Sequence, residues 1–556
     1  MSSAQSQYNI DVLVVGAGPV GLVAALVLAQ NGVSVRIIDK SPNFDHIGQR
    51  GAGLQPRSLE AYKFLGVLDD FIKKGTFEIS NMRSYDAEGK PTAQVPFRSK
   101  MEPTPEIPLP NGMTLGQDSN CAILRSHLSK FGVQVELSTE MVSFEQDDDS
   151  IIVTLKVNGA EEQTETVRAK FLVGADGAKG PTRRTAGINF VGATDMDIRA
   201  VIGDIELLNF DTEEEVRDMI MHNFSDANKN RTLIRRIPED PSAYFIFFVA
   251  TTFPPQRLME SKDFLQEQLR LISHRPELVV HKVRNVAEWK LNERVADHLQ
   301  VGRVFIAGDA GHCHSPVGGQ GLNSGVLDAM NLAWKLAFTL KHSSPLTLLS
   351  TYEEERLPVL REMLRMTNSM ASKAFKSTDM SKAAWQRPPA LRQLGVHCRW
   401  SSVVFDELLE GGAGDVEGTS VEPEDVYGKD KSERLRAGDR APDAPGLVDG
   451  QGKSTELFDI LKPTYHTVVV LDKSILRAVA AVAAGYPKGS VRVIAALPEG
   501  HGVAGVDVYT DSQGHAQRAY GVEAGVKVAV IRPDGVVGGL LKGSGGLQKY
   551  FSKIFT

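Results

Sequence analysis

The amino-acid sequence predicts an α/β protein of more than one domain, and three observations support this prediction. The chain has 556 residues, more than one hydrophobic core usually supports. Ile10–Val15 is a β-branched apolar run that leads through a glycine-rich turn into an apolar segment, Leu22–Ala29, as in a βαβ unit. Strand patterns also recur near the C-terminus, at 466–471, 491–496 and 526–532, with room for helices between them.

Composition narrows the class of protein. Hydrophobic residues make up 42% and charged residues 24%, which is typical of a folded globular chain. The net charge of -7, without basic blocks, makes nucleic acid an unexpected partner. Three widely spaced cysteines favour a reducing, cytoplasmic location over a disulfide framework. The uncharged segment Val12–Ala29 is interrupted by glycine and proline, so we expect no membrane span.

The glycine-rich turn has the chemistry of a dinucleotide site. Gly16, Gly18 and Gly21 permit a tight turn and close approach of the backbone to a pyrophosphate, which the N-terminus of the next helix would attract. A second strand, 33–38, ends at Asp39, which is placed to accept hydrogen bonds from an adenosine ribose. This turn alone does not distinguish FAD from NAD.

Two later segments point to a flavin. The strand 171–175 precedes Asp176 in FLVGADGAKGPTRR, and the strand 304–307 precedes Asp309 in AGDAGHCHSPVGGQGLN. With these motifs the chain resembles the single-component flavoprotein aromatic hydroxylases, the group of para-hydroxybenzoate hydroxylase and phenol hydroxylase, over about the first 340 residues. The resemblance implies a Rossmann-like domain that binds FAD, and NAD(P)H that binds without a second βαβ domain.

We expect the cofactor to contact residues from all three motifs. Asp309 ends a strand, so its carboxylate can reach a ribityl hydroxyl, and the glycines that follow let the backbone run flat against a planar ring. The resemblance places Pro316 near the ring, Arg50 near the flavin phosphates and Gln117 at the ribityl chain. Gly180 stands where the family has serine. The full set expected to bind the cofactor is Gly16, Gly18, Gly21, Asp39, Arg50, Gln117, Asp176, Asp309, Gly319, Gly321, Leu322 and Asn323.

The resemblance also implies an activity. We expect a monooxygenase that uses NAD(P)H and O2, through a C4a-hydroperoxyflavin, to hydroxylate a small electron-rich aromatic compound, phenolic or polyketide-like. Epoxidation, decarboxylative hydroxylation and Baeyer–Villiger insertion stay open, as does a non-catalytic flavin-binding scaffold. Phenol hydroxylase has an aspartate, implicated as a base, where this chain has Ala52, so Tyr244 and His222 are the alternative candidates. We expect no metal at the adjacent residues 312–314, which cannot complete a tetrahedral site.

The domain boundaries follow from composition. Residues 1–410 form a discontinuous FAD-binding domain, with a β-sheet substrate domain from about 80–115 and 200–290. Residues 411–436 form a linker rich in Gly, Asp, Glu and Ser. Residues 437–556 resemble the thioredoxin-like domain of phenol hydroxylase, but no cysteine follows Cys398, so thiol exchange there is impossible. We therefore expect this domain to act in packing or in the formation of a homodimer.

Overall fold

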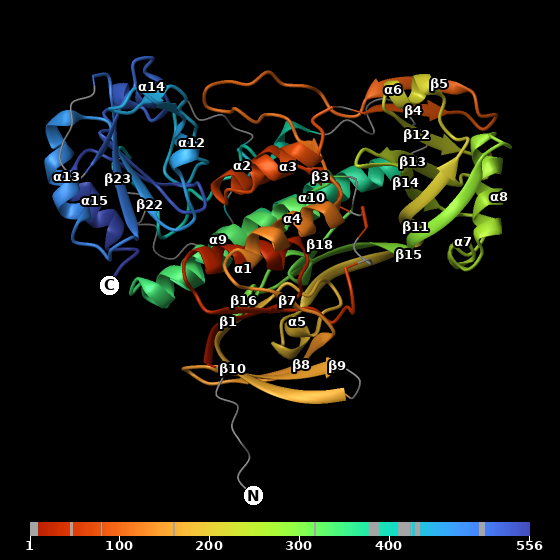
Figure 1. Ribbon diagram of the computed structural model, residues 1–556, viewed down its shortest axis with the longest axis horizontal. Helices are drawn as coiled ribbons and strands as arrows, with labels where there is room; N and C mark the ends of the chain where they lie inside the picture. The colour runs from red at the N-terminus through yellow and green to blue at the C-terminus, as the bar shows by residue number, and fades with distance from the viewer. Residues whose placement is uncertain are drawn as a thin grey trace, which may run out of the picture.

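Three large β-sheets and the helices around them make up the computed structural model (Figure 1). The structure describes residues 9–44, 48–49, 51–78, 80–158, 162–315, 318–376, 388–409, 423, 425–428, 434–499 and 506–556. Arg50, Pro316 and most of the predicted linker therefore lie outside the described residues. None of the helices in the described ranges combines the length and the hydrophobicity needed to cross a membrane.

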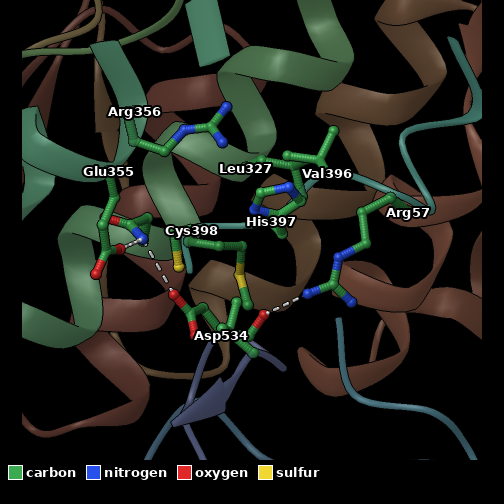
Figure 2. A pocket seen from close by; sticks show the side chains of 11 residues that line it. Arg57, Leu327, Glu355, Arg356, Val396, His397, Cys398 and Asp534 are labelled. Atoms are coloured by element: carbon green, nitrogen blue, oxygen red, sulfur yellow. Dashed lines mark hydrogen bonds between the residues drawn. The ribbon is translucent and has the colours of Figure 1, made fainter. Parts of the chain in front are cut away.

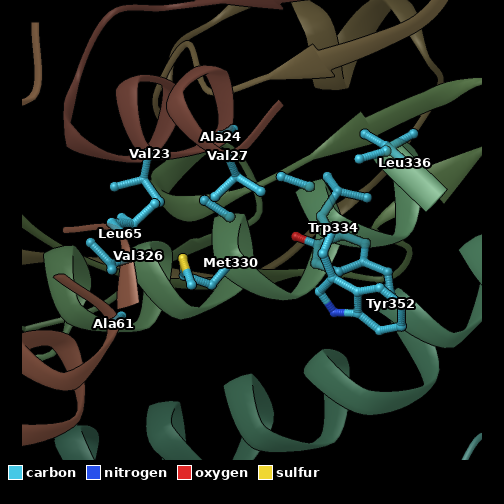
Figure 3. Packing of buried hydrophobic residues seen from close by; sticks show 14 of the residues in the cluster. Val23, Ala24, Val27, Ala61, Leu65, Val326, Met330, Trp334, Leu336 and Tyr352 are labelled. Atoms are coloured by element: carbon cyan, nitrogen blue, oxygen red, sulfur yellow. The ribbon is translucent and has the colours of Figure 1, made fainter. Parts of the chain in front are cut away.

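The first sheet is the predicted βαβ unit. Strand β1 (Asn9–Val15) pairs in parallel with β2 (Val35–Ile38) and with the end of β10 (Glu162–Gly174), which in turn pairs with β17 (Val304–Ile306). Helix α1 (Pro19–Gln30) is buried along most of its length. Its Val23 and Val27 lie against Val326 and Met330 of α9 (Gly321–Lys341), and this packing fixes the turn before α1 relative to the start of α9 (Figure 3).

The second sheet is larger than the predicted substrate domain. Its longest strands, β11 (Phe190–Leu208) and β15 (Val279–Ala296), extend beyond the expected bounds of 200–290. Helix α8 (Lys262–Ser273) buries Leu265 and Leu269 against one face of this sheet. The strand order is β18 (His312–Cys313), β15, β11, β14 (Asp240–Val249), β13 (Arg231–Ile237), β12 (Ile220–Ser225), β4 (Asn81–Tyr85) and β5 (Pro91–Pro96).

The third sheet contains the C-terminal strands. Strands β22 (His466–Val470), β23 (Val491–Leu497) and β24 (Asp507–Thr510) are parallel neighbours, and β25 (Val528–Ile531) and β26 (Val537–Leu541) continue the sheet in antiparallel pairing. The three strands predicted here are thus confirmed, while the thioredoxin-like classification stays a prediction. The sheet lies beside α9 and α10 (Thr347–Lys376) of the same chain, as Figure 1 shows for its blue strands.

Candidate functional site

A cleft of about 340 Å³ lies at the carboxyl ends of β1 and β2. Gly16 has a φ of +100°, a conformation that favours glycine, and a Cβ on Gly21 would lie 2.0 Å from the carbonyl oxygen of Gly16. Gly18 differs, because a Cβ there would meet nothing within 4 Å. The first and third glycines are thus required by packing, whereas the second leaves open space where a phosphate can approach the backbone. The cleft is lined by Gly16 and Gly18 together with Asp39, Phe44, Gln117, Met141, Asp176 and Pro181.

Asp39 holds the glycine turn in place. Its carboxylate accepts hydrogen bonds from the backbone N–H of Ala17 (2.8 Å) and of Ser41 (2.9 Å). The same carboxylate lines the cleft, so its remaining lone pairs can accept from a ribose hydroxyl. Asp39 therefore both stabilises the conformation of the turn and lies where it can make the predicted contact with the ribose.

Asp176 is largely committed to its own loop. One carboxylate oxygen accepts from the N–H (2.9 Å) and the hydroxyl (2.7 Å) of Thr182, while the other is buried without a partner among the described residues. Burial raises the pKa of this carboxyl. A Cβ at Gly180 would lie 2.1 Å from the Asp176 carboxyl carbon. The glycine at this position therefore makes room for the carboxylate, which a serine would force to move.

Asp309 lies in a short 3-10 turn, Gly308–Ala310, directly after β17. Asp309 borders open space, and the protein atoms around its carboxyl group raise the pKa of that group by desolvation. Asp328 of α9 fixes the turn, because its carboxylate accepts from the Gly308 N–H (3.2 Å) and from Nε2 of His312 (3.1 Å). Arg356 of α10 donates to the other oxygen of Asp328 at 2.7 Å. The turn that carries Asp309 is thus braced by α9 and α10.

The start of α9 meets two other segments of the site. The side chain of Asn323 is fully buried; it donates to the carbonyl oxygens of Gly53 and Gly319, both at 2.8 Å, and accepts from the N–H of Gln55 at 2.7 Å. A Cβ at Gly51 would lie within 3.1 Å of both the Gln117 amide oxygen and Leu322. The structure therefore brings Gln117, Leu322 and Asn323 together around residues 51–55.

Gly319 and Gly321 each meet a local requirement. Gly319 has a φ of +61°. A Cβ on Gly321 would lie 3.7 Å from the Asp309 carboxylate and 3.2 Å from His314 Nε2, so Gly321 lies beside the Asp309 turn. Asn323 and Gly319 thus shape the loop, while Gly321 leaves the neighbourhood of Asp309 uncrowded.

The two candidate bases do not join this group. Tyr244 is 5% exposed in the core between the second sheet and α8, and its ring lies edge-on to Phe210. His222 is 1% exposed and bonded on both ring nitrogens, to the Tyr85 hydroxyl (2.7 Å) and to Asp211 (2.9 Å). The alternation of residues along a strand divides the side chains between two faces, but it does not identify the face that a helix covers. The structure assigns both side chains to the face packed against α8.

His222 also belongs to a cluster whose ligand atoms could surround a cation. Atoms of Asp211, Glu215 and His222 lie within 4.8 Å of one another. Arg275 already donates to both oxygens of Glu215, at 2.7 and 3.1 Å, and so supplies positive charge to the cluster. The adjacent histidines 312 and 314 have separate partners, Asp328 and the Ser315 carbonyl oxygen.

Asp328 and Arg356 were not predicted from the sequence. Both are almost fully buried charged residues in helices whose other buried positions are mostly apolar. A charge at an apolar helix position is the signal that could have revealed them, because buried charges are rarely tolerated without a partner.

The described residues fit FAD. The glycine turn leaves open space at Gly18, Asp39 reaches the same cleft, and Gln117 connects this cleft to the segment packed on the start of α9. Asp309 offers a solvent-accessible carboxylate beside that helix. Asp39, the glycine turn and Gln117 thus line one cleft, and Gly51 and Gly321 connect Gln117 and the start of α9 with the Asp309 turn.

Comparisons with known proteins agree with this assignment. A family model described as "FAD binding domain" matches residues 9–367. A flavin-dependent monooxygenase of Mycobacteroides abscessus is 31% identical over 83% of this chain and 88% of its own length. Pentachlorophenol 4-monooxygenase of Sphingobium chlorophenolicum is 28% identical, covering 95% and 93% of the two chains. Aklavinone 12-hydroxylase of Streptomyces purpurascens is 28% identical, covering 96% and 95%.

Solved structures share the fold over the full length. The flavin-dependent monooxygenase PieE, solved with FAD and substrate, has a TM-score of 0.77 at 22% identity and covers 98% of this chain and 100% of its own. Aklavinone-11 hydroxylase, solved with FAD and aklavinone, has a TM-score of 0.75 at 24% identity and covers 100% and 99%.

Proposed function

We propose, from the premise that the chain belongs to this FAD binding domain family and is an FAD-dependent monooxygenase, that it uses NAD(P)H and O2 to hydroxylate an electron-rich aromatic compound. Relatives along nearly the whole chain are named for pentachlorophenol and aklavinone, one a simple phenol and the other polycyclic. The observation that carries the proposal is the meeting of Asp309, Gly321 and Leu322 beside residues 51–55.

Each group has a role that follows from its position. The turn at Gly16–Gly18 and the start of α1 would hold the pyrophosphate, Asp39 the ribose, and Asp309 and Gln117 the ribityl chain. Bound FAD, once reduced, supplies an oxygen atom from O2 in electrophilic form. The N-terminus of α9 would place partial positive charge beside the ring. The chain's part in the chemistry is to position substrate and cofactor and to exclude water.

The remaining parts of the proposal concern the assembly and the site. We propose that Arg50 and Pro316 contact the flavin and that the protein acts as a homodimer in the cytoplasm. The C-terminal residues 437–556 serve as a packing unit without redox chemistry, since the last cysteine is Cys398.

The test is a substrate screen with the purified holoenzyme. Phenols and polycyclic aromatics are supplied with NADH or NADPH, and cofactor oxidation is followed together with the mass of the product. A gain of one oxygen atom, coupled to NAD(P)H oxidation that the aromatic compound stimulates, is the expected result. A flavin-containing protein that oxidises neither nicotinamide in the presence of any aromatic compound would favour the non-catalytic scaffold instead.

A further inference from the structure

One face of the second sheet, which we call the open face, is partly exposed at β14, where the other face is covered by α8. Along β14 the buried residues Tyr244, Ile246 and Phe248 alternate with the partly exposed Phe245 and Phe247. The buried set belongs to the core that includes α8. Because side chains alternate across a strand, Phe245 and Phe247 lie on the opposite face.

The strand register extends this open face sideways. Phe247 lies opposite Leu233 of β13 and Ile202 of β11, and its ring meets Trp289 edge-on at 5.2 Å between centroids. One row along, Phe245 lies opposite Arg235 and Asp204. The open face therefore carries aromatic and aliphatic side chains. They end at the row that contains Arg235 and Asp204, which we call the charged row.

The charged row faces the segment that meets the start of α9. The N–H of Gln49 donates to Asp204 at 2.9 Å, and the other Asp204 oxygen is buried without a partner among the described residues. Burial, reinforced by Asp118, raises the pKa of Asp204 to about 6. Two residues after Gln49 the chain reaches Gly51, which lies against Leu322 and Gln117 of the cofactor site. The open face is thus directed toward the proposed position of the flavin.

Arg98 is the unbalanced charge at this place. Its Nη2 donates to Thr114 Oγ1 at 3.0 Å, while Nε and Nη1 are buried and have no hydrogen-bond partner in the described part of the chain. Thr114 pairs with Gly53, whose carbonyl oxygen accepts from Asn323. Burial, together with the charge of Arg235, lowers the pKa of Arg98 to about 10.

The neighbouring carboxylates interact electrostatically with Arg235 rather than with Arg98. Glu239 and Asp204 both raise the pKa of Arg235, against the larger effect of its burial. Among the residues that the structure describes, no carboxylate raises the pKa of Arg98, and the charged group that affects it is Arg235. A buried guanidinium with unused donors and a cationic neighbour requires an anion, because leaving it unpaired costs free energy.

We propose that Arg98 and Arg235 together bind an anionic oxygen of the aromatic substrate, whose ring lies on Phe245 and Phe247. The anionic oxygen can be an enolate, a phenolate or a carboxylate, since each accepts from a guanidinium. This inference rests on the proposed function and specifies its substrate class: planar aromatic compounds with an acidic group.

The test measures binding to the oxidised holoenzyme by calorimetry, without NAD(P)H. One probe pair is 2-hydroxy-1,4-naphthoquinone and its 2-methoxy ether; the other is 1-hydroxy-2-naphthoate and its amide. The pairs separate an enolate from a carboxylate source. The variants are Arg98→Met and Arg98→Lys, with Arg199→Met, an exposed arginine on the same sheet, as the matched control.

We expect wild type to prefer the acidic member of at least one pair, and Arg98→Met to weaken that member by about 10- to 100-fold, as for a lost hydrogen bond to a charged group. Arg98→Met should change the affinity for the neutral member by less than about threefold to tenfold. Arg98→Lys and Arg199→Met should change the affinity for the acidic member by no more than this. The wild-type preference should also disappear below the pKa of the probe, a readout that needs no variant.

Three results would overturn the proposal. The first is a wild-type enzyme that prefers neither acidic probe. The second is an Arg98→Met variant that loses the acidic and the neutral probes equally. The third is an Arg98→Met variant whose binding of the acidic probe is unchanged. Because binding is measured without turnover, failure of this proposal is distinguishable from failure of the monooxygenase activity, which the substrate screen reports separately.

Discussion

Asp309 borders open space on a turn that α9 and α10 brace, and the protein atoms around its carboxyl group raise the pKa of that group. An exposed acid on a braced turn is available to a ligand at little cost in reorganisation. Removal of this carboxylate should therefore appear directly as weaker binding of the cofactor.

Replacement of Asp309 by alanine should weaken FAD binding by about 1.5–3 kcal/mol, the range for hydrogen bonds to charged groups. The measurement is the FAD dissociation constant of the apoprotein, from quenching of flavin fluorescence. Asp263→Ala, at an exposed position in the first turn of α8, is the control. Equal affinities for wild type and Asp309→Ala would remove Asp309 from the cofactor site.

Ala52 lies beside the same site, in the segment that meets the start of α9. Its carbonyl oxygen accepts from the N–H of Leu115 at 2.8 Å, so its backbone position is fixed. An alanine cannot remove a proton, and Tyr244 and His222 lie on the other face of the second sheet. A substrate that is already ionised needs no base, in keeping with the proposed anion site at Arg98.

We expect wild type to hydroxylate plain phenol poorly and Ala52→Asp to raise that rate by up to about 100-fold, the lower end of the contribution of a general base. Ala52→Asn, which has the same shape without a base, should give no gain. Product formation across pH is the measurement. Fast hydroxylation of phenol by wild type, unchanged in Ala52→Asp, would show that position 52 does not govern substrate activation.

At the level of elements, α9 and α10 together support the Asp309 turn. Asp328 and Arg356 are buried and bonded to each other, and Asp328 bonds to the backbone that carries Asp309. Breaking one partner of a buried ion pair typically costs about 3–5 kcal/mol. The pair therefore ties the conformation of a loop to the packing of two long helices.

Replacement of Asp328 by asparagine should lower the thermal stability and weaken FAD binding together, because the unpaired Arg356 charge stays buried and the turn loses its brace. The matched variant Arg356→Lys keeps the charge and should lose less thermal stability and less FAD affinity. Thermal unfolding with and without added FAD is the measurement. If Asp328→Asn lost stability but bound FAD as tightly as wild type, the turn would not depend on this brace.

Elements with a local signal could be predicted from the sequence, and those that depend on distant partners could not. The strand, glycine turn and helix at residues 9–30 follow from apolar runs and glycine chemistry, and the structure has them. The length of β11 could not be predicted, because its ends are stabilised by β15, far along the chain. In the site, Asp309 followed from its motif, and the charge at an apolar helix position is a signal for Asp328, whereas Arg98 is identified only by neighbours from other segments.

For the molecule as a whole, the C-terminal sheet and the α9–α10 pair share one charged contact. Arg532 donates to both carboxylate oxygens of Glu355 at 2.7 and 2.8 Å, and Lys335 donates to Glu355 at 2.9 Å. All three side chains are at most 1% exposed. The surrounding positive charges hold the pKa of Glu355 below its usual range despite burial.

A cavity of about 40 Å³ lies beside this contact, between the two parts of the chain (Figure 2). Arg57 donates to the backbone carbonyl oxygens of Asp534 and Gly535, both at 3.0 Å. The cavity is large enough for one or two water molecules, which its polar lining would bind. The C-terminal unit thus packs on its own chain.

Truncation after residue 410 should therefore lower the stability of the remaining chain strongly, since it leaves Lys335 and Glu355 without Arg532. Arg532→Met in the full-length protein is the milder variant, expected to cost about 3–5 kcal/mol, because it leaves the buried Asp534 without its arginine partner and Glu355 with Lys335 as its remaining cation. The measurement is urea unfolding, with Arg477→Met, on α13 (Leu476–Ala483) of the same unit, as the control. A truncated chain as stable as the full-length protein would mean that the charged contact contributes nothing.

The position of Arg532 has a consequence for biosynthesis. Glu355 and Arg532 are separated by 177 residues, so on the ribosome Glu355 emerges well before Arg532. At about 5–20 residues per second this delay is on the order of ten to forty seconds. During this delay Glu355 has Lys335 but not Arg532 as a partner, and the apolar surface around Trp334 stays uncovered. Nascent chains arrested before residue 532 should accordingly be more sensitive to protease and bind more chaperone than the released protein.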